Sequence, residues 1–469
     1  MTTDCSAQQL EFQGVGRRRV VASFEGGTLS SDGGALLLGE VERRRGILRR
    51  FTACFHDRRQ PALIEHSVEE LVRQRVLGLA LSYEDLNDHD VLRSDPLLAT
   101  IVGKVDPTGS DRRREEDRGK PLAGKSTLNR LELGAQTQDR YRKIAVDEQA
   151  VDRFLVDVFL SAYEQAPESI VLDLDATDDP LHGEQEGRFF HGYYGDYCYL
   201  PLYVFCGSHL LCARLRRSNI DASAGAVEEV ERIVGQIRNR WPAVAIILRA
   251  DSGFAREELM VWCEQHGVEY VFGLARNARL QRALGGELAQ ARTLSEASGH
   301  AERLYKDFTY STRKSWSRCR RVIGKAEHLP QGANPRFLVT SLNQEMWAAA
   351  PLYEQLYCAR GEMENRIKEQ QLCLFADRTS SHWMKSNQMR LWFSSVAYIL
   401  LDELRRLGLA GTELARARCD TIRIKLLKIG AQIRVSVRRV WICLASSYPY
   451  ASLFRQVIER LRAGPITII

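Results

Sequence analysis

The sequence predicts an α/β protein with a mixed β-sheet flanked by helices, and three observations support this fold class. Mostly helical patterns precede Ser169, and strand-sized apolar runs begin there. Three consecutive strand patterns are then followed by alternating helices and strands, which is typical of a mixed sheet with helices packed on it. Two basic segments lie outside this alternation, and we expect them to form separate regions.

Length and composition narrow the class of protein. At 469 residues and roughly 100–200 residues per domain, the chain should hold two to four domains. Apolar residues make up 44% and charged residues 27%, which excludes a disordered or fibrous chain. No apolar run approaches the roughly 18 residues that span a bilayer, and the polar start lacks a signal-peptide core. Eleven scattered cysteines without a CxxC pair predict a reduced cytoplasm and exclude a disulfide framework and a zinc ribbon.

The first 165 residues are predicted to form a mostly helical region. Residues 17–32 form the predicted exception, a hairpin with Gly26 and Gly27 at its turn. Helical periodicity covers residues 35–55, 66–80, 126–133 (with Ser126 as the N-cap) and 147–164. Residues 106–121 have no apolar face, so we expect an exposed loop there.

Residues 166–275 and 336–400 are predicted to form the sheet and its helices. Strand patterns lie at 169–175, 197–205, 209–216, 243–251, 268–275 and 336–342. Helical patterns lie at 222–240, 255–266 and near 350–376. Short apolar runs bounded by turn or charged residues are typical of buried strands, whereas the longer patterns repeat with the helical period.

Two segments carry the positive charge. Residues 276–335 hold 12 Lys and Arg against 5 Asp and Glu, and residues 401–469 hold 13 against 5. The first is predicted to be a strand-rich insertion, with strand-like alternation at 304–322. The second is predicted to contain a hairpin of residues 421–428 and 432–444. Such segments suggest a polyanionic partner, most simply nucleic acid, but a solvated surface explains the charge equally well.

Residues 119–126 match the phosphate-loop pattern GxxxxGK[ST]. That loop needs a buried strand immediately before its first glycine. The preceding residues here are RRREED, which cannot form a central strand. We therefore expect a polar loop and no nucleotide cofactor. The sequence also lacks HExxH and GxSxG patterns, so zinc protease and serine hydrolase classes have no support.

Three acidic residues stand where a sheet can bring them together. Asp175 ends the first predicted strand, Asp251 ends the strand at 243–251, and Glu364 lies within the helix near 350–376. Carboxylates at neighbouring strand ends face one crevice, and oxygen ligands of this type suit Mg²⁺ or Mn²⁺. Two such ions can clamp the oxygens of a phosphodiester displacement. In the plainer alternative, Asp175 starts a turn with Thr177 and Asp251 caps the next helix.

Tyr357, Arg360, Glu364 and Lys368 are spaced by 3, 4 and 4 residues and share one helix face. Aromatic, cationic and acidic groups make a poor core stripe and suit a metal and phosphate site. A solvated ladder of i,i+4 salt bridges is the alternative.

These residues resemble the DDE transposases of bacterial insertion sequences. The likeness is greatest to the branch with a Tyr-x2-Arg-x3-Glu-x6-Lys signature, which Tyr357, Arg360 and Glu364 match. Its final basic position is Gln371 here, and Lys368 lies one turn earlier and could replace it.

The resemblance extends to other parts of the chain. Asp175-Ala176-Thr177 matches the first aspartate of the family, with Asp173 as the reserve, and Asp251 matches the second. Residues 30–40 resemble the insertion-sequence thirteen-eighty group.

The resemblance implies a ribonuclease-H-like core, interrupted by the insertion at 276–335, with Asp175, Asp251 and Glu364 as catalytic residues and ligands of two Mg²⁺ ions. Mn²⁺ should substitute. It implies metal-dependent cleavage and strand transfer at terminal inverted repeats, that is, cut-and-paste transposition, with a DNA hairpin intermediate in some relatives. The implied partners are double-stranded transposon ends and target DNA, in a synaptic complex of a homodimer. The protein is expected in the bacterial cytoplasm, associated with the nucleoid and not with a membrane.

Tyr357, Arg360 and Lys368 are expected to position the DNA strand. Further candidate DNA contacts are Trp316, Arg318, Arg320 and Arg321, although strand packing is the preferred interpretation of the tryptophan. The aromatic residues of 189–199 could stack on unpaired bases, but we expect them to pack the sheet. Three alternatives stay open: a metal-dependent nuclease without strand transfer, an inactive DNA-binding relic, for which Gln371 leaves room, and a nucleotide hydrolase that uses the phosphate-loop string.

Overall fold

The computed structural model describes residues 9–133 and 143–463. Residues 1–8, 134–142 and 464–469, which belong to the predicted N-terminal and C-terminal regions, lie outside the described part. The chain divides into two compact units. The first comprises Met1–Thr52, Asp57–Leu131 and Glu403–Ile469, and the second comprises Ala53–His56 and Glu132–Asp402. Within the described residues, no helix has the length and apolar character needed to cross a bilayer.

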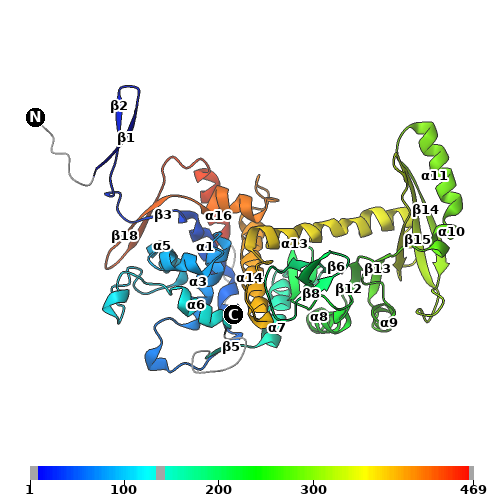
Figure 1. Cartoon of the computed structure of the whole chain (residues 1–469), viewed down its shortest axis with the longest axis horizontal. Coiled ribbons are helices and arrows are strands. Elements are labelled where there is room, and N and C mark those ends of the chain that lie inside the picture. The colour runs from blue at the N-terminus through cyan, green and yellow to red at the C-terminus, as the bar shows by residue number, and fades with distance from the viewer. Residues whose placement is uncertain (1–8, 134–142, 464–469) are drawn as a thin grey trace, which may run out of the picture. The chain divides into compact units, whose positions relative to one another are not determined.

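The second unit is built on one large mixed sheet (Figure 1). Its strands, in spatial order, are β11 (His209–Arg214), β10 (Leu202–Cys206), β6 (Ser169–Ala176), β12 (Ala245–Ala250), β13 (Glu269–Leu274), β17 (Arg336–Thr340), β15 (Arg320–Leu329) and β14 (Glu302–Tyr310), with β16 (Gly332–Ala333) paired to β15. β6, β12 and β13 run parallel, whereas β10 and β11 form an antiparallel hairpin beside β6. This arrangement confirms the predicted mixed sheet.

Alternation along β6 assigns its two faces to different layers. Leu172 and Leu174 belong to a buried cluster with residues of α8 (Ala226–Arg240) and α9 (Glu257–Gln265). The side chain of Val171, on the opposite face, packs in a second cluster with Leu352 and Leu356. Because successive strand residues point to opposite faces, Asp173 and Asp175 share the face of Val171. α7 (Glu148–Leu160) also packs in the first cluster, beside β11.

The segment that covers the second face is helical but irregular. It contains α12 (Ala349–Pro351), the π-helix η5 (Leu352–Tyr357), the 3-10 turn η6 (Cys358–Arg360) and α13 (Gly361–Leu374). Figure 1 shows it as one long run on the side of the strands opposite α8 and α9. The predicted helix near 350–376 is therefore confirmed in extent, with π and 3-10 turns in place of regular α-helix before Gly361. α14 (Met384–Gly408) follows.

The basic segment at 276–335 is only partly strand-rich. It begins with α10 (Ala278–Ala283) and α11 (Gly285–Ser298), which the sequence analysis missed, and their apolar Leu280 and Ala291 are buried. β14 and β15 then extend the large sheet, since β15 pairs with β17. The helices explain why strand alternation is confined to the later part of this segment. The division of the chain into four regions remains a prediction.

A small sheet lies between β6 and β10 in the sequence. It consists of β7 (Asp179–Pro180), β9 (Asp196–Tyr199) and β8 (Phe189–His191). The predicted strand at 197–205 is thus divided between two sheets at Leu200-Pro201, where proline cannot donate a ladder hydrogen bond. Packing of the aromatic residues is confirmed for Tyr199, which is fully buried, but is wrong for Tyr193, which is 86% exposed.

The first unit is largely helical and combines both ends of the chain. Its N-terminal helices are α1 (Leu36–Arg45), α2 (Ile47–Thr52), α3 (Val68–Ala80), α4 (His89–Leu92), α5 (Pro96–Val102) and α6 (Lys125–Leu133), whose last two residues belong to the second unit. Short 3-10 turns are η1 (Gly33–Ala35), η2 (Pro61–Leu63), η3 (Leu86–Asp88) and η4 (Glu115–Asp117). β4 (Phe55–Asp57) pairs with β5 (Ile144–Val146); β5 and the first two residues of β4 belong to the second unit.

The C-terminal elements of this unit are α15 (Cys419–Ile422), the π-helix η7 (Arg423–Leu427), β18 (Ala431–Val435), β19 (Val440–Leu444) and α16 (Ala451–Ala463). β18 pairs with β19 and with the N-terminal β3 (Leu29–Ser30). The strand predicted at 421–428 is wrong: this stretch is helical, and the hairpin lies wholly within 431–444.

Two local predictions in this unit are also wrong. The N-terminal hairpin is β1 (Leu10–Val15) and β2 (Arg18–Ala22), so its turn lies at Gly16 and not at Gly26 and Gly27. Gly16 has a φ of 62°, which glycine adopts without steric cost. Ser126 is not an N-cap, because α6 begins at Lys125, whose N–H donates to Asp90 Oδ1 at 3.1 Å.

Candidate active site

Asp175 and Asp251 meet at one edge of the sheet. β6 and β12 are parallel neighbours in which Leu174 lies opposite Ala250, so Asp175 on β6 and Asp251, the first residue after β12, come next on the two segments. Their side chains point to the face covered by η5, η6 and α13. Asp251 Oδ1 accepts the N–H of Gly253 at 2.9 Å, and α9 begins only at Glu257. Asp251 therefore orders its own turn and does not cap α9.

Arg360 connects the first aspartate to the glutamate. Its Nη1 donates to Asp175 Oδ1 at 3.0 Å, and its Nη2 donates to Glu364 Oε1. Glu364 lies one helical turn after Arg360, so the irregular turn at η6 and the start of α13 aim both side chains at the end of β6. The side chain of Asp175 is 16% exposed and that of Glu364 is 41% exposed.

The three carboxylates influence one another. Burial, together with the charges of Asp251 and Glu364, raises the pKa of Asp175 to about 6 against the opposing effect of Arg360. Like charges held within electrostatic reach are costly unless a cation lies among them. In the structure this cation is the guanidinium of Arg360.

Asp173 has a different environment from Asp175. Arg249 Nε and Nη2 donate to its two carboxylate oxygens at 2.5 and 2.8 Å, and both side chains are buried. Arg249 also donates to the carbonyl of Leu356 in η5. This ion pair fastens the helical segment to the sheet. The sequence analysis missed Arg249, although an arginine inside the apolar strand AIILRA was the available signal.

The other residues of the helix face are arranged around the same edge. Tyr357 is half-buried, and burial raises its pKa. Its hydroxyl lies so close to Gly273 that a Cβ there would be 2.7 Å away. Lys368 is exposed, and within the described residues no ion pair engages it. Tyr357 and Arg360 therefore reach the carboxylates, whereas Lys368 stays open to solvent.

Gln371, at the position where the signature has a basic residue, makes internal contacts. Its Nε2 donates to Asp179 Oδ1 at 3.0 Å and to the Asp178 carbonyl at 3.2 Å. Asp179 is fully buried, and burial raises its pKa to about 8. Gln371 therefore joins α13 to β7.

The donor set fits a hard divalent cation in kind but is not gathered into a ready site. Carboxylate oxygens are the ligands that Mg²⁺ and Mn²⁺ prefer. Across residues 9–133 and 143–463, no three or more His, Cys, Asp or Glu side chains form a group that could hold a metal. Arg360 lies between Asp175 and Glu364, so its movement would have to accompany entry of a cation.

Comparison with protein families decides the identity of the fold. A family model described as transposase DDE domain group 1 matches residues 12–466, nearly the whole chain. The chain belongs to this transposase family. A comparison with curated proteins finds no match. Membership confirms the resemblance to DDE transposases and implies a ribonuclease-H-like fold, a DNA substrate and general use of divalent metals; the signature branch and the insertion-sequence group remain predictions.

The four side chains near β15 that were predicted to contact DNA differ in their exposure to solvent. Arg318 has a side chain that is 60% exposed and lies 3.3 Å from Glu264. Arg320 is buried and paired with Glu257 and Glu264, each at 2.7 Å. We therefore do not include Arg320 among the proposed DNA contacts of the DDE domain.

Arg321 is likewise engaged internally, by Asp307 at 2.5 Å and by the carbonyls of Leu342 and Trp347. It is also left out of the proposed contacts. Trp316 packs edge-on against Tyr310, with ring centroids 5.7 Å apart, in agreement with the preferred interpretation that it packs against the strands.

The first unit contains a strongly basic cavity of about 500 Å³. Its charged lining has seven basic and three acidic side chains: Arg59, Arg93, Arg112, Arg113, Arg114, Lys125 and Arg130, with Glu65, Asp90 and Asp117. Arg112 is buried and anchored by Glu65 at 3.0 Å and His66 at 2.7 Å. Arg130 is exposed, with no ion pair among the described residues. The excess of four positive charges makes this cavity a candidate site for DNA phosphates.

The phosphate-loop string lines this cavity but does not form a phosphate loop. η4 and not a strand precedes it, and Lys125 Nζ lies 3.2 Å from Asp90 Oδ2 and 3.0 Å from Asn87 Oδ1.

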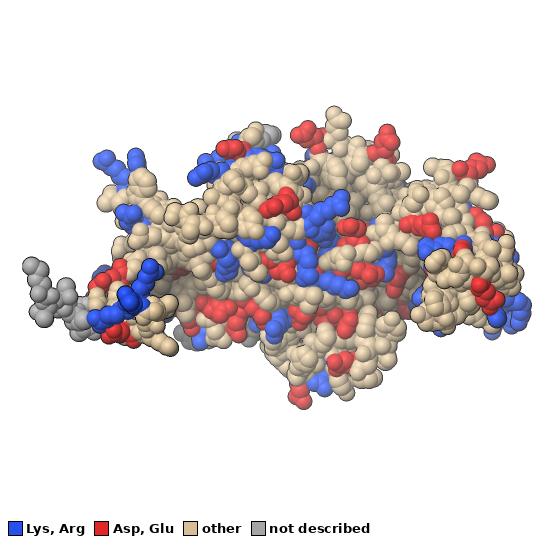
Figure 2. Space-filling model, turned by 90° about the horizontal axis from the view of Figure 1, so that it is seen from above, with Lys and Arg blue, Asp and Glu red and all other residues tan. Residues whose placement is uncertain are grey.

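On the face shown in Figure 2, basic and acidic side chains are intermixed.

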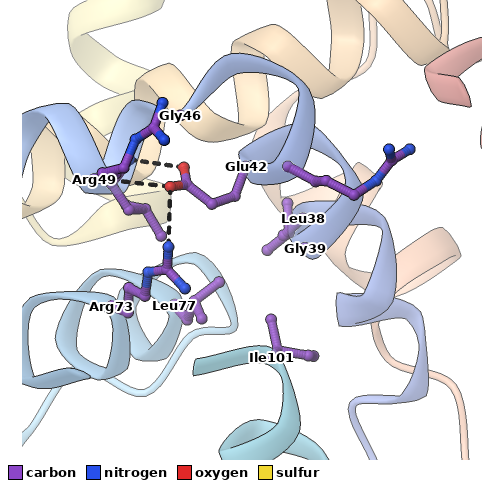
Figure 3. A pocket seen from close by; sticks show the side chains of 10 residues that line it. Leu38, Gly39, Glu42, Gly46, Arg49, Arg73, Leu77 and Ile101 are labelled. Atoms are coloured by element: carbon purple, nitrogen blue, oxygen red, sulfur yellow. Dashed lines mark hydrogen bonds and ion pairs between the residues drawn. The ribbon is translucent and has the colours of Figure 1, made fainter. Parts of the chain in front are cut away.

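A second cavity of about 320 Å³ in the first unit has a structural explanation (Figure 3). The carboxylate of Glu42 points into it and accepts the N–H groups of Leu48 at 2.7 Å and Arg49 at 3.0 Å. Arg73 Nη2 lies 3.5 Å from Glu42 Oε1. Glu42 therefore satisfies the first backbone donors of α2, where Gly46 ends α1 in the left-handed conformation.

Proposed function

We propose that this protein is a DNA transposase that cleaves phosphodiester bonds at the terminal inverted repeats of an insertion sequence and joins the released ends to target DNA. Family membership supports the general activity. The observation that carries the specific proposal is the meeting of Asp175, Asp251 and Glu364, from two strands and one helix, around Arg360.

Asp175, Asp251 and Glu364 would hold two Mg²⁺ ions, for which Mn²⁺ should substitute. Bound ions of this kind activate water or a 3′-hydroxyl for attack on phosphorus and neutralise the charge that develops. Arg360 pairs with two of the carboxylates, Asp175 and Glu364, and offsets part of their negative charge. When a metal ion takes over the pairing with these carboxylates, the planar guanidinium of Arg360 becomes available to a phosphate oxygen. Tyr357 and Lys368 would then orient the strand from the same helical segment.

Duplex binding would use phosphate contacts outside this site. The basic cavity of the first unit offers cations from four separate segments, among them Arg59, Arg93 and Arg130. Phosphate contacts fix the register of a protein on DNA without reading its sequence. Arg318 is the exposed candidate in the second unit.

The experiment is cleavage of the DNA that flanks the gene, by purified protein with Mg²⁺, beside two variants of one helix. Glu364→Gln should abolish cutting at a pair of inverted repeats. Glu362→Gln is the matched control, because the side chain of Glu362 is 75% exposed and its ion pair among the described residues is a long one, with Arg366 at 3.6 Å. Its cutting rate should stay within about twofold of the unmodified protein.

The products separate the remaining alternatives. Joined strands support transposition, whereas cutting without joining supports a nuclease. Specific binding without cutting would indicate an inactive relic. Cutting that survives Glu364→Gln would overturn the assignment of the metal ligands.

A further inference from the structure

The hairpin formed by β8 and β9 exposes aromatic rings that the sheet does not use. Phe189 is 37% exposed, Phe190 58%, Tyr193 86% and Tyr197 42%. We call residues 189–197 the aromatic hairpin. Large aromatic side chains gathered on a surface usually mark a binding site, because their exposure to water is unfavourable.

The aromatic hairpin is tied to the candidate active site by Tyr194. Its hydroxyl donates to the carbonyl of Ala176, the residue after Asp175, at 3.2 Å. This hydrogen bond places the Tyr194 hydroxyl at the last residue of β6, directly after Asp175.

Tyr194 in turn orients the exposed ring beside it. The ring centroids of Tyr193 and Tyr194 lie 5.0 Å apart in an edge-on arrangement. His191 contacts Tyr194 from another direction, with centroids 4.9 Å apart. Tyr193 is thus held against the ring that contacts the end of β6, while its own surface faces solvent.

Two arginines accompany the rings. The guanidinium of Arg188 lies over the ring of Tyr197, 4.3 Å from its centroid. Arg217 lies beside Gly187, where a Cβ would be 3.0 Å from its Nε. In the described part of the chain, neither arginine has an ion pair with a carboxylate. Rings interleaved with cations match a nucleotide, whose base stacks and whose phosphate is anionic.

We propose that the aromatic hairpin binds an unpaired base of the DNA strand next to the scissile phosphate, with Tyr193 as the main stacking surface. This inference rests on the proposed function and names the form in which the DNA end is held. A ring can cover the face of a base only when that base has left the duplex stack. Stacking tolerates any base, so this site adds affinity at the cut without adding sequence preference.

The test is a double-mutant cycle between the ring and the base. Affinity of the full chain for duplex inverted-repeat DNA is measured in chelator, so that no cleavage occurs. Single abasic positions are moved through the nucleotides on either side of the cut. Tyr193→Ala should weaken binding of intact DNA about tenfold, and one abasic position should weaken binding of the unmodified protein by a similar factor. On DNA with that abasic position, Tyr193→Ala should weaken binding no further.

Two variants serve as controls. Tyr193→Trp should retain the affinity, because it keeps a stacking surface. Met346→Ala changes another exposed apolar side chain of the same unit, 76% exposed, and should leave binding unchanged.

Additive losses at every abasic position, or no loss on Tyr193→Ala, would overturn the inference. A change in the self-association of Tyr193→Ala in the absence of DNA would also overturn the inference, because the aromatic hairpin would then be a protein interface. These failures differ from failure of the proposed function, in which the unmodified protein would not cut inverted-repeat DNA with Mg²⁺.

Discussion

At the scale of single residues, the structure gives different environments to Asp175 and to Asp173, which the sequence analysis kept as the reserve. Asp173 and Asp175 share one face of β6, yet Asp173 is closed off by Arg249, whereas Asp175 meets Arg360 and the other carboxylates. No sequence pattern reveals this difference, because it depends on which arginine the neighbouring strand and helix supply.

Substitution of the two aspartates should separate their roles. Asp173→Asn leaves the buried Arg249 without its ionic partner and should lower the free energy of unfolding by about 3–5 kcal/mol. Asp175→Asn should retain most of the stability and abolish cleavage. Urea denaturation and a cleavage assay on both variants check this. Active, folded Asp175→Asn would reinstate Asp173 as the candidate ligand.

Asp179 should make stability depend on pH. Its pKa is raised to about 8 by burial, so the folded protein retains a proton that the unfolded chain loses near its ordinary value. The protonated carboxyl contributes its full stabilisation below about pH 4, and this contribution declines as pH rises to about 8.

Asp179→Asn should remove that decline, because an amide does not ionise. Relative to the unmodified protein, the variant should therefore gain on the order of 5 kcal/mol in stability between pH 4 and pH 8, because the pKa is raised from 3.8 to about 8 and each pH unit is worth about 1.4 kcal/mol. Denaturant unfolding at several pH values between 4 and 8 measures the difference. Parallel stability curves for the two proteins would contradict a buried, protonated Asp179.

At the scale of elements, long periodic segments were predictable and local irregularities were not. The order of β6, β10, β11, α8, β12, α9 and β13 follows from apolar patterning. The π-helical turn at η5 does not follow from this patterning, and neither does the hydrogen bond by which Arg249 contacts the carbonyl of Leu356 within it. The helices α10 and α11 were missed because their buried apolar set is sparse, with Leu280 in α10 and Ala291 in α11.

The basic cavity yields an element-scale prediction about DNA affinity. Arg59→Ala and Arg130→Ala should each weaken binding to duplexes of any sequence and lower the salt dependence by about one phosphate contact. Arg292→Ala is the control, since that arginine is exposed on α11 and paired with Glu296. Binding isotherms at several salt concentrations measure both effects. Loss of affinity for free nucleotides alone would show that the cavity serves a small ligand instead of DNA.

At the scale of the whole molecule, transposition demands more than one chain can supply. Asp175, Asp251 and Glu364 form one candidate site, whereas cut-and-paste transposition must process two DNA ends and join both to a target. Two copies of the chain, each holding one end, satisfy this requirement with closed twofold symmetry. The sequence indicated this assembly only through family resemblance, because no residue pattern encodes a symmetry axis.

We therefore expect a complex of two chains and two inverted-repeat duplexes. Duplexes of two lengths, mixed with Glu364→Gln protein, should give three bound species in a native gel, and sedimentation should report two chains in each. Cleavage by mixtures of Glu364→Gln and unmodified chains should fall more steeply than the fraction of active chains if joining needs both sites. A strictly proportional decline, with one duplex per chain, would show that each chain acts alone.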